Sequence, residues 1–403
     1  MPTGSRATFA LAARANHLRV RHGHEPNRVT FVELFFDLVF VFAVTQLSHG
    51  LVAHLTPLGA LQAALLMIAV WWAWIDTTWI TNWLDPDRAP VRLLLFALML
   101  LGLVLSASIP KAFEDRALAL ALAYVLMQAV RDLFMLWALR RHDDRNYRNF
   151  LRIGAWHAAV MPMWLAGAFL GGTAQIVLWA LAVAIESIAP IVGFWVPRFG
   201  RSSTADWVVE GEHMAERCGL FIIIALGESI LITGATFAGL SWTAEHVGAF
   251  LVAFVGSVAL WVVYFNIGAV RASRQIAASD DPGRIARSGY TYIHILIVAG
   301  IIVVAVGDEL VLHHPASPVD ARTAIVLIAG PALYLIGNSL FKRLSADNLP
   351  LSHSVGLGLL ALLAFAVDAA TPLLLSAATT AVLILVATWE SISLRGSAVK
   401  SQA

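Results

Sequence analysis

The stretch VTFVELFFDLVFVFAVTQLSHGL, residues 29–51, is almost wholly apolar, yet it carries two acids, Glu33 and Asp37. Its length suits a helix that crosses a membrane, which needs about 20 residues. A charged side chain at the centre of a membrane costs about 2.5–3.5 kcal/mol on insertion scales, so such residues usually face the protein interior and serve a function. The question is what two carboxylates, one helical turn apart, do in this segment.

The whole chain has the composition of a membrane protein. Of its 403 residues, 59% are hydrophobic and only 13% are charged, whereas a soluble domain has about 25% charged residues. Twelve apolar segments are expected to be helices, because an open backbone in lipid finds no hydrogen-bond partner. Cys218 is the only cysteine, which excludes an intramolecular disulfide. The twelve segments cover residues 30–53, 58–82, 91–109, 117–139, 151–170, 174–196, 214–237, 244–267, 288–308, 323–342, 352–367 and 372–391.

Lysines and arginines predict the orientation, since cytoplasmic loops of membrane proteins carry an excess of both. With the N-terminus in the cytoplasm, 23 of the 27 basic residues lie on the cytoplasmic side and three on the other, while Arg131 lies within a span. We therefore expect a multi-pass protein of the cell inner membrane with both termini in the cytoplasm. Residues 1–29 form a basic tail in this interpretation, because no apolar run there is long enough for a signal peptide.

An internal repeat is the second prediction. When Asp37 is aligned with Glu228, FDLVFVFAVTQL lies over GESILITGATFA, and later segments match in the same order at offsets between 190 and 207. Six spans in each half make the repeat parallel, as in transporters that bind substrate between their halves. The predicted fold is all-α, with a tail (1–29), a first half (30–196), a cytoplasmic linker (197–213), a second half (214–391) and a C-terminal tail (392–403).

Glu33 has a structural explanation. Thr30 to Glu33 reads TFVE, the capping box in which two side chains satisfy free amides at a helix start. Asp37 lies one turn deeper and has no such role. It is about 20° from Ser48 around the helix, so the two form one polar stripe.

Other polar residues in the apolar segments are candidates for a buried site. Glu228 follows Gly227, which permits close approach of another helix; a carboxylate bonded across a helix interface is the alternative. The mid-membrane set holds more acids than bases, which suits a proton or cation relay, since desolvation favours the neutral form of a carboxylate. Arg131 stays charged and needs an anionic partner. The candidates are Asp132, Glu186 and Asp37, and the sequence does not choose between them. The predicted central site for a proton or substrate comprises Asp37, Asp76, Arg131, Glu186 and Glu228, and Asp132 and His157 are further intramembrane candidates.

Several features have two interpretations that the sequence leaves open. One helical face carries Trp72, Asp76, Trp79 and Trp83. This face is either a packed aromatic seam between helices or an aromatic wall that lines a cavity beside Asp76. The i, i+3 spacing of His213 and Glu216 could place both on one metal ion, but a solvated or helix-capping pair is the simpler interpretation. Arg217, next to them, is interpreted as a cytoplasmic anchor. Near predicted span ends, and so interpreted as solvated, lie Asp308, Asp368 and Glu390.

Four segments resemble the low temperature requirement protein A family of bacterial membrane proteins: VTFVELFFDLVFVFAVTQLSHGL, WWAWIDTTWITNWLDPDRAPVRLL, SASIPKAF and HMAERCGLFIIIALGESIL. The resemblance covers nearly the whole chain and implies a polytopic membrane protein associated with growth in the cold. It implies no settled activity. The positions it carries over are Glu33, Asp37, Arg92, Pro110, His213, Glu216, Arg217 and Glu228.

A secondary transporter, driven by a proton gradient and moving a small neutral or cationic solute, is the leading functional hypothesis. The sequence carries no nucleotide-binding signature, so a gradient is the expected energy source. We expect no catalytic residue, metal or cofactor and no nucleic-acid partner; the expected partners are membrane lipids and a small solute or proton. The alternatives are a membrane sensor or scaffold that does not transport, and a membrane-embedded enzyme acting on a lipid.

The orientation makes a direct prediction. Reporter fusions after Leu170 should report the outside of the membrane, and fusions after Arg140 the cytoplasm. The reverse result would contradict the assignment from basic residues.

Overall fold

The computed structural model describes residues 17–19, 28–204, 207, 209–266, 281–344 and 349–400. Within that part of the chain the fold is all-α, as predicted, and each of the twelve apolar segments contains a helix. In the segments 174–196 and 352–367 the helix ends early, at Ile188 and Leu363. Most of the basic tail, part of the linker, and residues 267–280, 345–348 and 401–403 lie outside the described residues. The main helices are α2 (Phe31–Ala53), α3 (Pro57–Thr81), α4 (Ala89–Ser108), α5 (Ala117–Leu139), α6 (Asp144–Leu170), α7 (Gly172–Ile188), α8 (Gly211–Ala238), α9 (Ala244–Phe265), α12 (His294–His313), α13 (Ala321–Arg343), α14 (Leu351–Leu363) and α15 (Pro372–Lys400).

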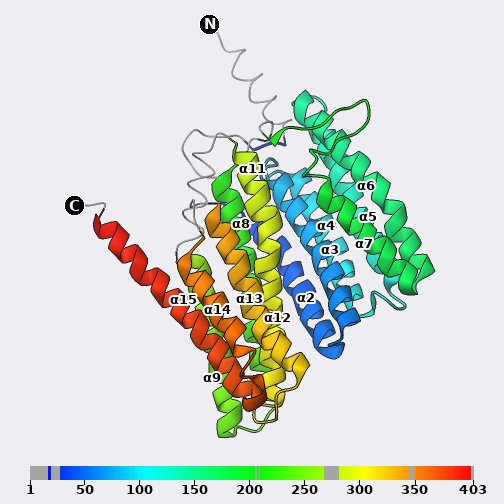
Figure 1. Ribbon diagram of the computed structural model, residues 1–403. Helices are drawn as coiled ribbons and strands as arrows, with labels where there is room; N and C mark the ends of the chain where they lie inside the picture. Colours follow the sequence, from blue (N-terminus) through cyan, green and yellow to red (C-terminus); the bar gives the residue numbers. More distant parts are fainter. Residues whose placement is uncertain are drawn as a thin grey trace. The chain divides into compact units, whose positions relative to one another are not determined.

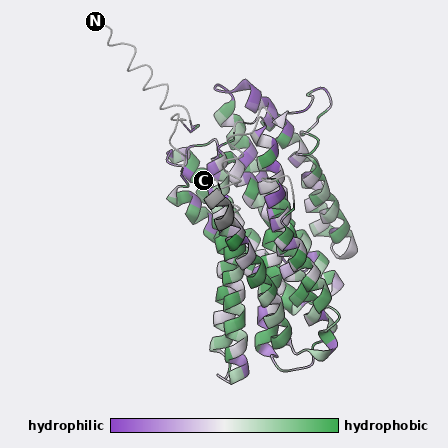
Figure 2. Cartoon of the chain, turned by 60° about the vertical axis from the view of Figure 1, so that its left-hand side comes forward, coloured by the Kyte–Doolittle hydropathy of each residue, from purple (hydrophilic) through white to green (hydrophobic). Residues whose placement is uncertain are grey.

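Ten of the described helices are long and apolar enough to cross a membrane, by length and composition. The other two, α7 and α14, are apolar but shorter, with 17 and 13 residues. Hydrophobic residues run along the length of the helices, and hydrophilic residues are densest toward helix ends and loops (Figure 2). The chain is therefore a multi-pass membrane protein.

The chain divides into two compact units, which are described separately. The first comprises Met1–Ala43, Ala64–Met214 and Asp280–Gly283, and the second comprises Val44–Ala63, Ala215–Ser279 and Arg284–Ala403. Helices α2, α3 and α8 each contribute residues to both units. Part of α2 and the start of α3 belong to the second unit. The two halves expected from the sequence stay a prediction.

Large aromatic side chains fill the first unit. Helix α5 packs against α4 and α6, and α6 packs against α7 (Figure 1). The rings of Tyr124, Trp164 and Trp179 contact one another in a row, with centroids 4.6 and 5.1 Å apart and planes tilted by 44° and 42°. Trp71 and Trp74 of α3 are also buried. Aromatic burial of this kind gives the unit a rigid apolar frame around its few polar groups.

Glycines bring α12 and α13 of the second unit close together, and the two helices run side by side in Figure 1. A Cβ atom on Gly300 would lie 2.5 Å from the backbone nitrogen of Tyr334. A Cβ atom on Gly337 would lie 2.9 Å from the backbone nitrogen of Ile297. Small residues at such crossings let the backbones meet, which is how helices associate where lipid removes the hydrophobic driving force.

Side-chain caps begin several helices. Asp143 accepts the backbone N–H of Asn146 at the start of α6, and Thr243 accepts that of His246 at the start of α9. Asp320 accepts the N–H groups of Arg322 and Thr323 at the start of α13. Hydrogen bonds from Thr323, chiefly from its backbone N–H, hold the pKa of Asp320 below its usual value. The helix boundaries therefore follow ordinary capping chemistry.

The close crossing of α12 and α13 predicts a specific sensitivity. Gly300→Ala should destabilise the purified protein by about 1–3 kcal/mol, because the added methyl group collides with backbone atoms of Tyr334. Thermal unfolding in detergent, followed by tryptophan fluorescence, measures the loss.

Gly358→Ala is the matched control, since a Cβ atom there meets nothing within 4 Å. Equal stability of the two variants would show that the helices do not meet at Gly300.

Candidate functional site

The partner of Arg131 is Asp76, which the sequence had not indicated. Arg131 of α5 is 1% exposed, and its Nη2 lies 2.8 Å from Oδ2 of Asp76 in α3. Nη1 also donates to the carbonyl of Ala73 and to the hydroxyl of Thr77, at 3.3 and 3.4 Å. The guanidinium is thus neutralised and hydrogen-bonded inside the first unit, as a permanently charged group must be.

A histidine and a second carboxylate continue this group. Nδ1 of His157 in α6 lies 2.7 Å from Oδ2 of Asp132, the residue that follows Arg131 in α5. Nε2 of the same ring lies 4.0 Å from Oδ2 of Asp76. His157 therefore stands between two carboxylates, and histidine is the side chain best suited to pass a proton from one group to another.

Glu186 of α7 is the third carboxylate. Its Oε2 accepts the hydroxyl of Tyr124 at 2.8 Å, and Gln128 donates to the same hydroxyl oxygen at 3.2 Å. Its other oxygen, Oε1, is buried and has no hydrogen-bond partner among the described residues. An unsatisfied carboxylate oxygen in a buried place costs free energy unless it carries a proton or meets a ligand.

We call Asp76, Arg131, Asp132, His157 and Glu186 the first-unit network. Four of the five groups are buried, and Asp76 has a side chain that is 20% exposed. If all three carboxylates were ionised, Arg131 and a protonated His157 would leave one negative charge uncompensated among the five groups. The network therefore has the chemistry to hold and exchange a proton.

Asp37 and Glu228, the two acids that the sequence alignment pairs, are both buried. Asp37 is 1% exposed, and its Oδ1 accepts the indole N–H of Trp74 at 2.8 Å. Glu228 is also 1% exposed, and its Oε2 accepts the hydroxyl of Thr45. Asp37 belongs to the first unit and Glu228 to the second. Their expected approach across a symmetry axis stays a prediction.

The aromatic face of α3 packs as a seam over part of its length. Trp79 and Trp83 have ring centroids 6.0 Å apart, and Trp207 lies 6.3 Å from the first and 5.2 Å from the second. These contacts favour the simpler of the two interpretations, although Trp83 also lines a cavity described below.

Glu33 both caps α2 and binds a histidine. The backbone N–H of Thr30 donates to its Oε2 at 2.9 Å, as in a capping box. Nε2 of His213, from the start of α8, lies 2.8 Å from its Oε1. Both side chains are fully buried. Two residues carried over by the family resemblance are therefore joined, although 180 positions separate them in sequence.

Arg19 and Asn82 complete this group, and neither was a candidate from sequence. Nη2 of Arg19 lies 3.1 Å from Oε2 of Glu33, and its Nε donates to the carbonyls of Thr81 and Leu84. Nδ2 of Asn82 lies 3.2 Å from Nδ1 of His213. The amide N–H of Asn82 can only donate, so Nδ1 faces a donor, while Nε2 faces both Glu33 and Nη2 of Arg19, which lies 3.2 Å away. Arg19 is one of five arginines in the basic tail, and nothing in the sequence indicated that it would contact Glu33.

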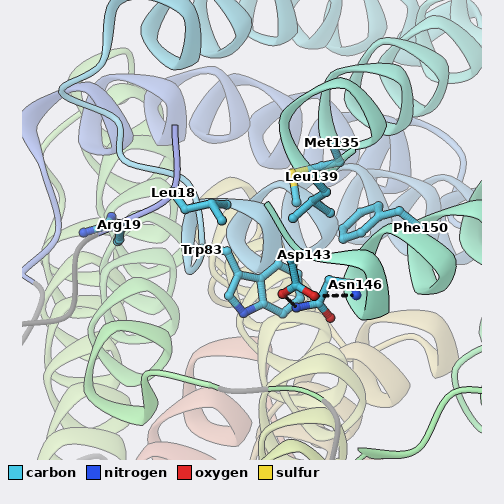
Figure 3. A pocket seen from close by; sticks show the side chains of 8 residues that line it. All are labelled: Leu18, Arg19, Trp83, Met135, Leu139, Asp143, Asn146 and Phe150. Atoms are coloured by element: carbon cyan, nitrogen blue, oxygen red, sulfur yellow. Dashed lines mark hydrogen bonds between the residues drawn. The ribbon is translucent and has the colours of Figure 1, made fainter. Parts of the chain in front are cut away.

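A cavity of about 180 Å³ lies beside Arg19 in the first unit (Figure 3). Trp83 forms one wall, and Asp143 and Asn146 supply polar groups, which are joined by hydrogen bonds that cap α6. The segment His17–Arg19 closes one side, since Leu18 pairs with Leu84 in an isolated bridge. The lining residues are Leu18, Arg19, Trp83, Met135, Leu139, Asp143, Asn146 and Phe150.

The remaining motif residues are spread over the structure. Arg92 is exposed and lies 3.7 Å from a carboxylate oxygen of Asp87. Pro110 is exposed in a short 3-10 helix, Ile109–Lys111. Glu216 is exposed, whereas Arg217 is fully buried. The role of Arg217 as a cytoplasmic anchor stays a prediction.

Two residues that were interpreted as solvated are buried in the second unit. Asp308 is 6% exposed and accepts the hydroxyl of Ser229 at 3.1 Å. Glu390 is 7% exposed, with Oε2 lying 2.6 Å from Nζ of Lys342 and Oε1 lying 3.3 Å from Nδ1 of His353. Both acids were placed near span ends, but α12 continues to His313 and α15 to Lys400, which puts them inside helices. Asp368 is exposed, as expected.

Comparisons with known proteins agree with this architecture. The family model for the bacterial low temperature requirement A protein (LtrA) matches residues 28–388. An uncharacterized protein of Rhizobium meliloti (strain 1021), RA0937, is 38% identical over 387 residues, which cover 96% of this chain and 94% of the relative. No solved structure matches. The chain therefore belongs to the bacterial low temperature requirement A family.

Proposed function

We propose that the protein is a proton-coupled secondary transporter of a small neutral or cationic solute, located in the cell inner membrane with both termini in the cytoplasm. The observation that carries the proposal is the first-unit network, in which three carboxylates accompany one arginine and one histidine. A proton is the simplest neutraliser of the remaining charge, because it needs no extra space inside a packed unit. A group that must hold a proton can also exchange it along a gradient.

His157 gives the network a path between acids. It lies 2.7 Å from Asp132 and 4.0 Å from Asp76, and Asp76 is the member with the most exposed side chain. A proton that enters at Asp76 can therefore reach Asp132 through the ring, with Arg131 holding Asp76 in place. Glu186 of α7 and Tyr124 of α5 add a third acid and a hydroxyl.

A corresponding group in the second unit supports the proposed two-fold repeat. There Lys342 of α13, His353 of α14 and Glu390 of α15 contact one another through Glu390. In the first unit the equivalent helices α5, α6 and α7 carry Arg131, His157 and Glu186. The sequence alignment pairs Glu186 with Glu390 directly. It places Arg131 opposite Asn338, and Lys342 lies one helical turn beyond Asn338. A duplicated transporter fold would explain why three successive helices in each unit carry a base, a histidine and an acid in that order.

A membrane sensor or scaffold is the second candidate. Asp76–Arg131, Asp132–His157 and Glu390–Lys342 are close pairs, and buried pairs of this kind also fix a structure without moving any ion. In either case a role in growth at low temperature is the expectation from the family description.

Amide substitutions separate the transporter from the scaffold. Asp37→Asn, Glu186→Gln and Glu228→Gln retain an oxygen that can accept the bonds from Trp74, Tyr124 and Thr45. They remove only the ability to ionise. In proteoliposomes with an internal pH indicator and a broad panel of solutes, we expect wild-type protein to couple solute flux to a pH change. The variants should insert at normal levels and lose at least about 90% of the coupled flux, a factor that corresponds to about 1.4 kcal/mol.

Asp115→Asn is the matched control for these variants, because Asp115 is an exposed acid of the first unit that pairs only loosely with Lys111, at 3.8 Å. It should transport like the wild type. Full activity of all three buried amides would exclude these three acids as proton carriers, and loss of all three proteins from the membrane would assign the acids a structural role.

A further inference from the structure

The segment 189–203, which follows α7 and is called the 189–203 loop below, contains a tight turn. Val196 and Gly200 exchange both of their backbone hydrogen bonds, at 3.0 Å each. Phe194 and Arg198 adopt positive φ angles of 50° and 68°, a conformation that is unfavourable for side chains other than glycine. Such a backbone persists only where surrounding contacts impose it, so the shape of this loop is fixed by the rest of the first unit.

Helix α6 holds the 189–203 loop at a defined height. Nε and Nη2 of Arg152 donate to the carbonyl of Phe199, at 3.0 and 2.6 Å. The indole N–H of Trp156 donates to the carbonyl of Trp195 at 3.1 Å. Both donors lie in the first two turns of the apolar segment 151–170, so the loop lies at the level where this segment is expected to enter the membrane.

The loop exposes large apolar side chains at this level. Trp195 is 54% exposed, Phe199 is 58% exposed and Ile191 is 61% exposed. Aromatic side chains are enriched where a membrane meets water, and apolar side chains next to basic ones are typical of surfaces that lie in this interface. The exposed side of the loop is therefore suited to contact lipid.

Arginines form the other part of this surface. Arg148 is exposed and lies one helical turn before Arg152, on the same face of α6. Arg198 and Arg201 are exposed in the loop itself. In the part of the chain that the structure describes, no carboxylate lies within ion-pair distance of any of these four guanidinium groups. Their positive charge is therefore available to an anion from outside the chain.

We propose that the 189–203 loop and the start of α6 bind the headgroup of an anionic phospholipid. Arg148, Arg152 and Trp156 follow one another at intervals of one turn, which places basic groups toward the water and an aromatic group toward the membrane. A phospholipid has the matching order, with its phosphate at the surface and its acyl chains below. A nucleic acid or a soluble acidic protein would contact the arginines and leave the exposed apolar side chains uncovered.

The predicted orientation agrees with this choice of lipid. In that orientation the end of α7 and the start of α6 face the cytoplasm, and the cytoplasmic leaflet attracts basic segments through its anionic lipids. None of the four arginines belongs to the first-unit network, so lipid binding does not depend on the proposed transport.

Thermal unfolding of the purified full chain in detergent tests the binding. Anionic phosphatidylglycerol is titrated in mixed micelles at constant ionic strength, with zwitterionic phosphatidylcholine in parallel. A ligand that binds only the folded protein raises the unfolding temperature in a saturable way. Phosphatidylglycerol should produce this rise, and phosphatidylcholine should produce a smaller one. Glycerol phosphate, which has the charge without the acyl chains, should have no effect at the same concentrations.

Substitutions locate the lipid. Arg198→Asn combined with Arg201→Gln should raise the half-saturating concentration of phosphatidylglycerol by at least about fivefold, and asparagine tolerates the positive φ angle of Arg198. Arg148→Gln should raise it less, and it tests the site without altering the loop. Arg116→Gln is the matched control, because Arg116 is an exposed arginine of the first unit that donates to the carbonyl of Ala107. It should respond like the wild type.

An equal rise with phosphatidylglycerol and phosphatidylcholine, or no rise with either, would overturn the proposal. An unchanged response in both the double variant and Arg148→Gln would also overturn it. A rise with glycerol phosphate as large as that with phosphatidylglycerol would assign the arginines to a soluble anion and remove the lipid site. Solute flux, present or absent, changes none of these outcomes.

Discussion

The ion pair between Arg131 and Asp76 is the contact on which the interior of the first unit depends. Arginine cannot lose its charge in a protein, so its burial requires an anion beside it. Removal of one member of such a pair costs about 3–5 kcal/mol, because the other is left charged and unpaired. Asp76, Ala73 and Thr77 lie along one stretch of α3, so this pair also fixes how α3 and α5 pack.

The charge balance around this pair links structure to function. Arg131 pairs with Asp76, and His157 lies between this ion pair and Asp132. Glu186 accepts a hydrogen bond from the hydroxyl of Tyr124. Acids in these positions are stable in a dry interior only if a proton or another cation accompanies them. The same reasoning applies to Glu228 of the second unit, which accepts the hydroxyl of Thr45.

Sequence reasoning predicted what depends on one helix and failed where two helices distant in sequence meet. The twelve apolar segments, the Thr30–Glu33 cap and the burial of Asp37, Glu186 and Glu228 all follow from local composition and spacing. The partner of Arg131 does not, because Asp76 lies 55 residues away and only the packing of α3 against α5 brings it close.

Misplaced helix ends account for the other differences. Lys342 and Glu390 fall at the edges of hydropathy segments, where a charged residue is ordinarily solvated. Helix α15 extends to Lys400, past the predicted end of its segment, and Glu390 pairs with Lys342 inside the second unit. Arg19 could not be predicted for a different reason: one arginine among five in a basic tail carries no sign that it binds Glu33.

The central claim is that the buried carboxylates carry an exchangeable proton, and infrared difference spectroscopy of the purified protein tests it most directly. A protonated carboxyl group absorbs at a frequency distinct from that of a carboxylate, so a change of pH reports which form is present. We predict a carboxyl band that responds to bulk pH in the wild type and is reduced in Glu186→Gln. A spectrum with no such band, or a band that is unchanged in Glu186→Gln, Asp132→Asn and Glu228→Gln alike, would contradict the account.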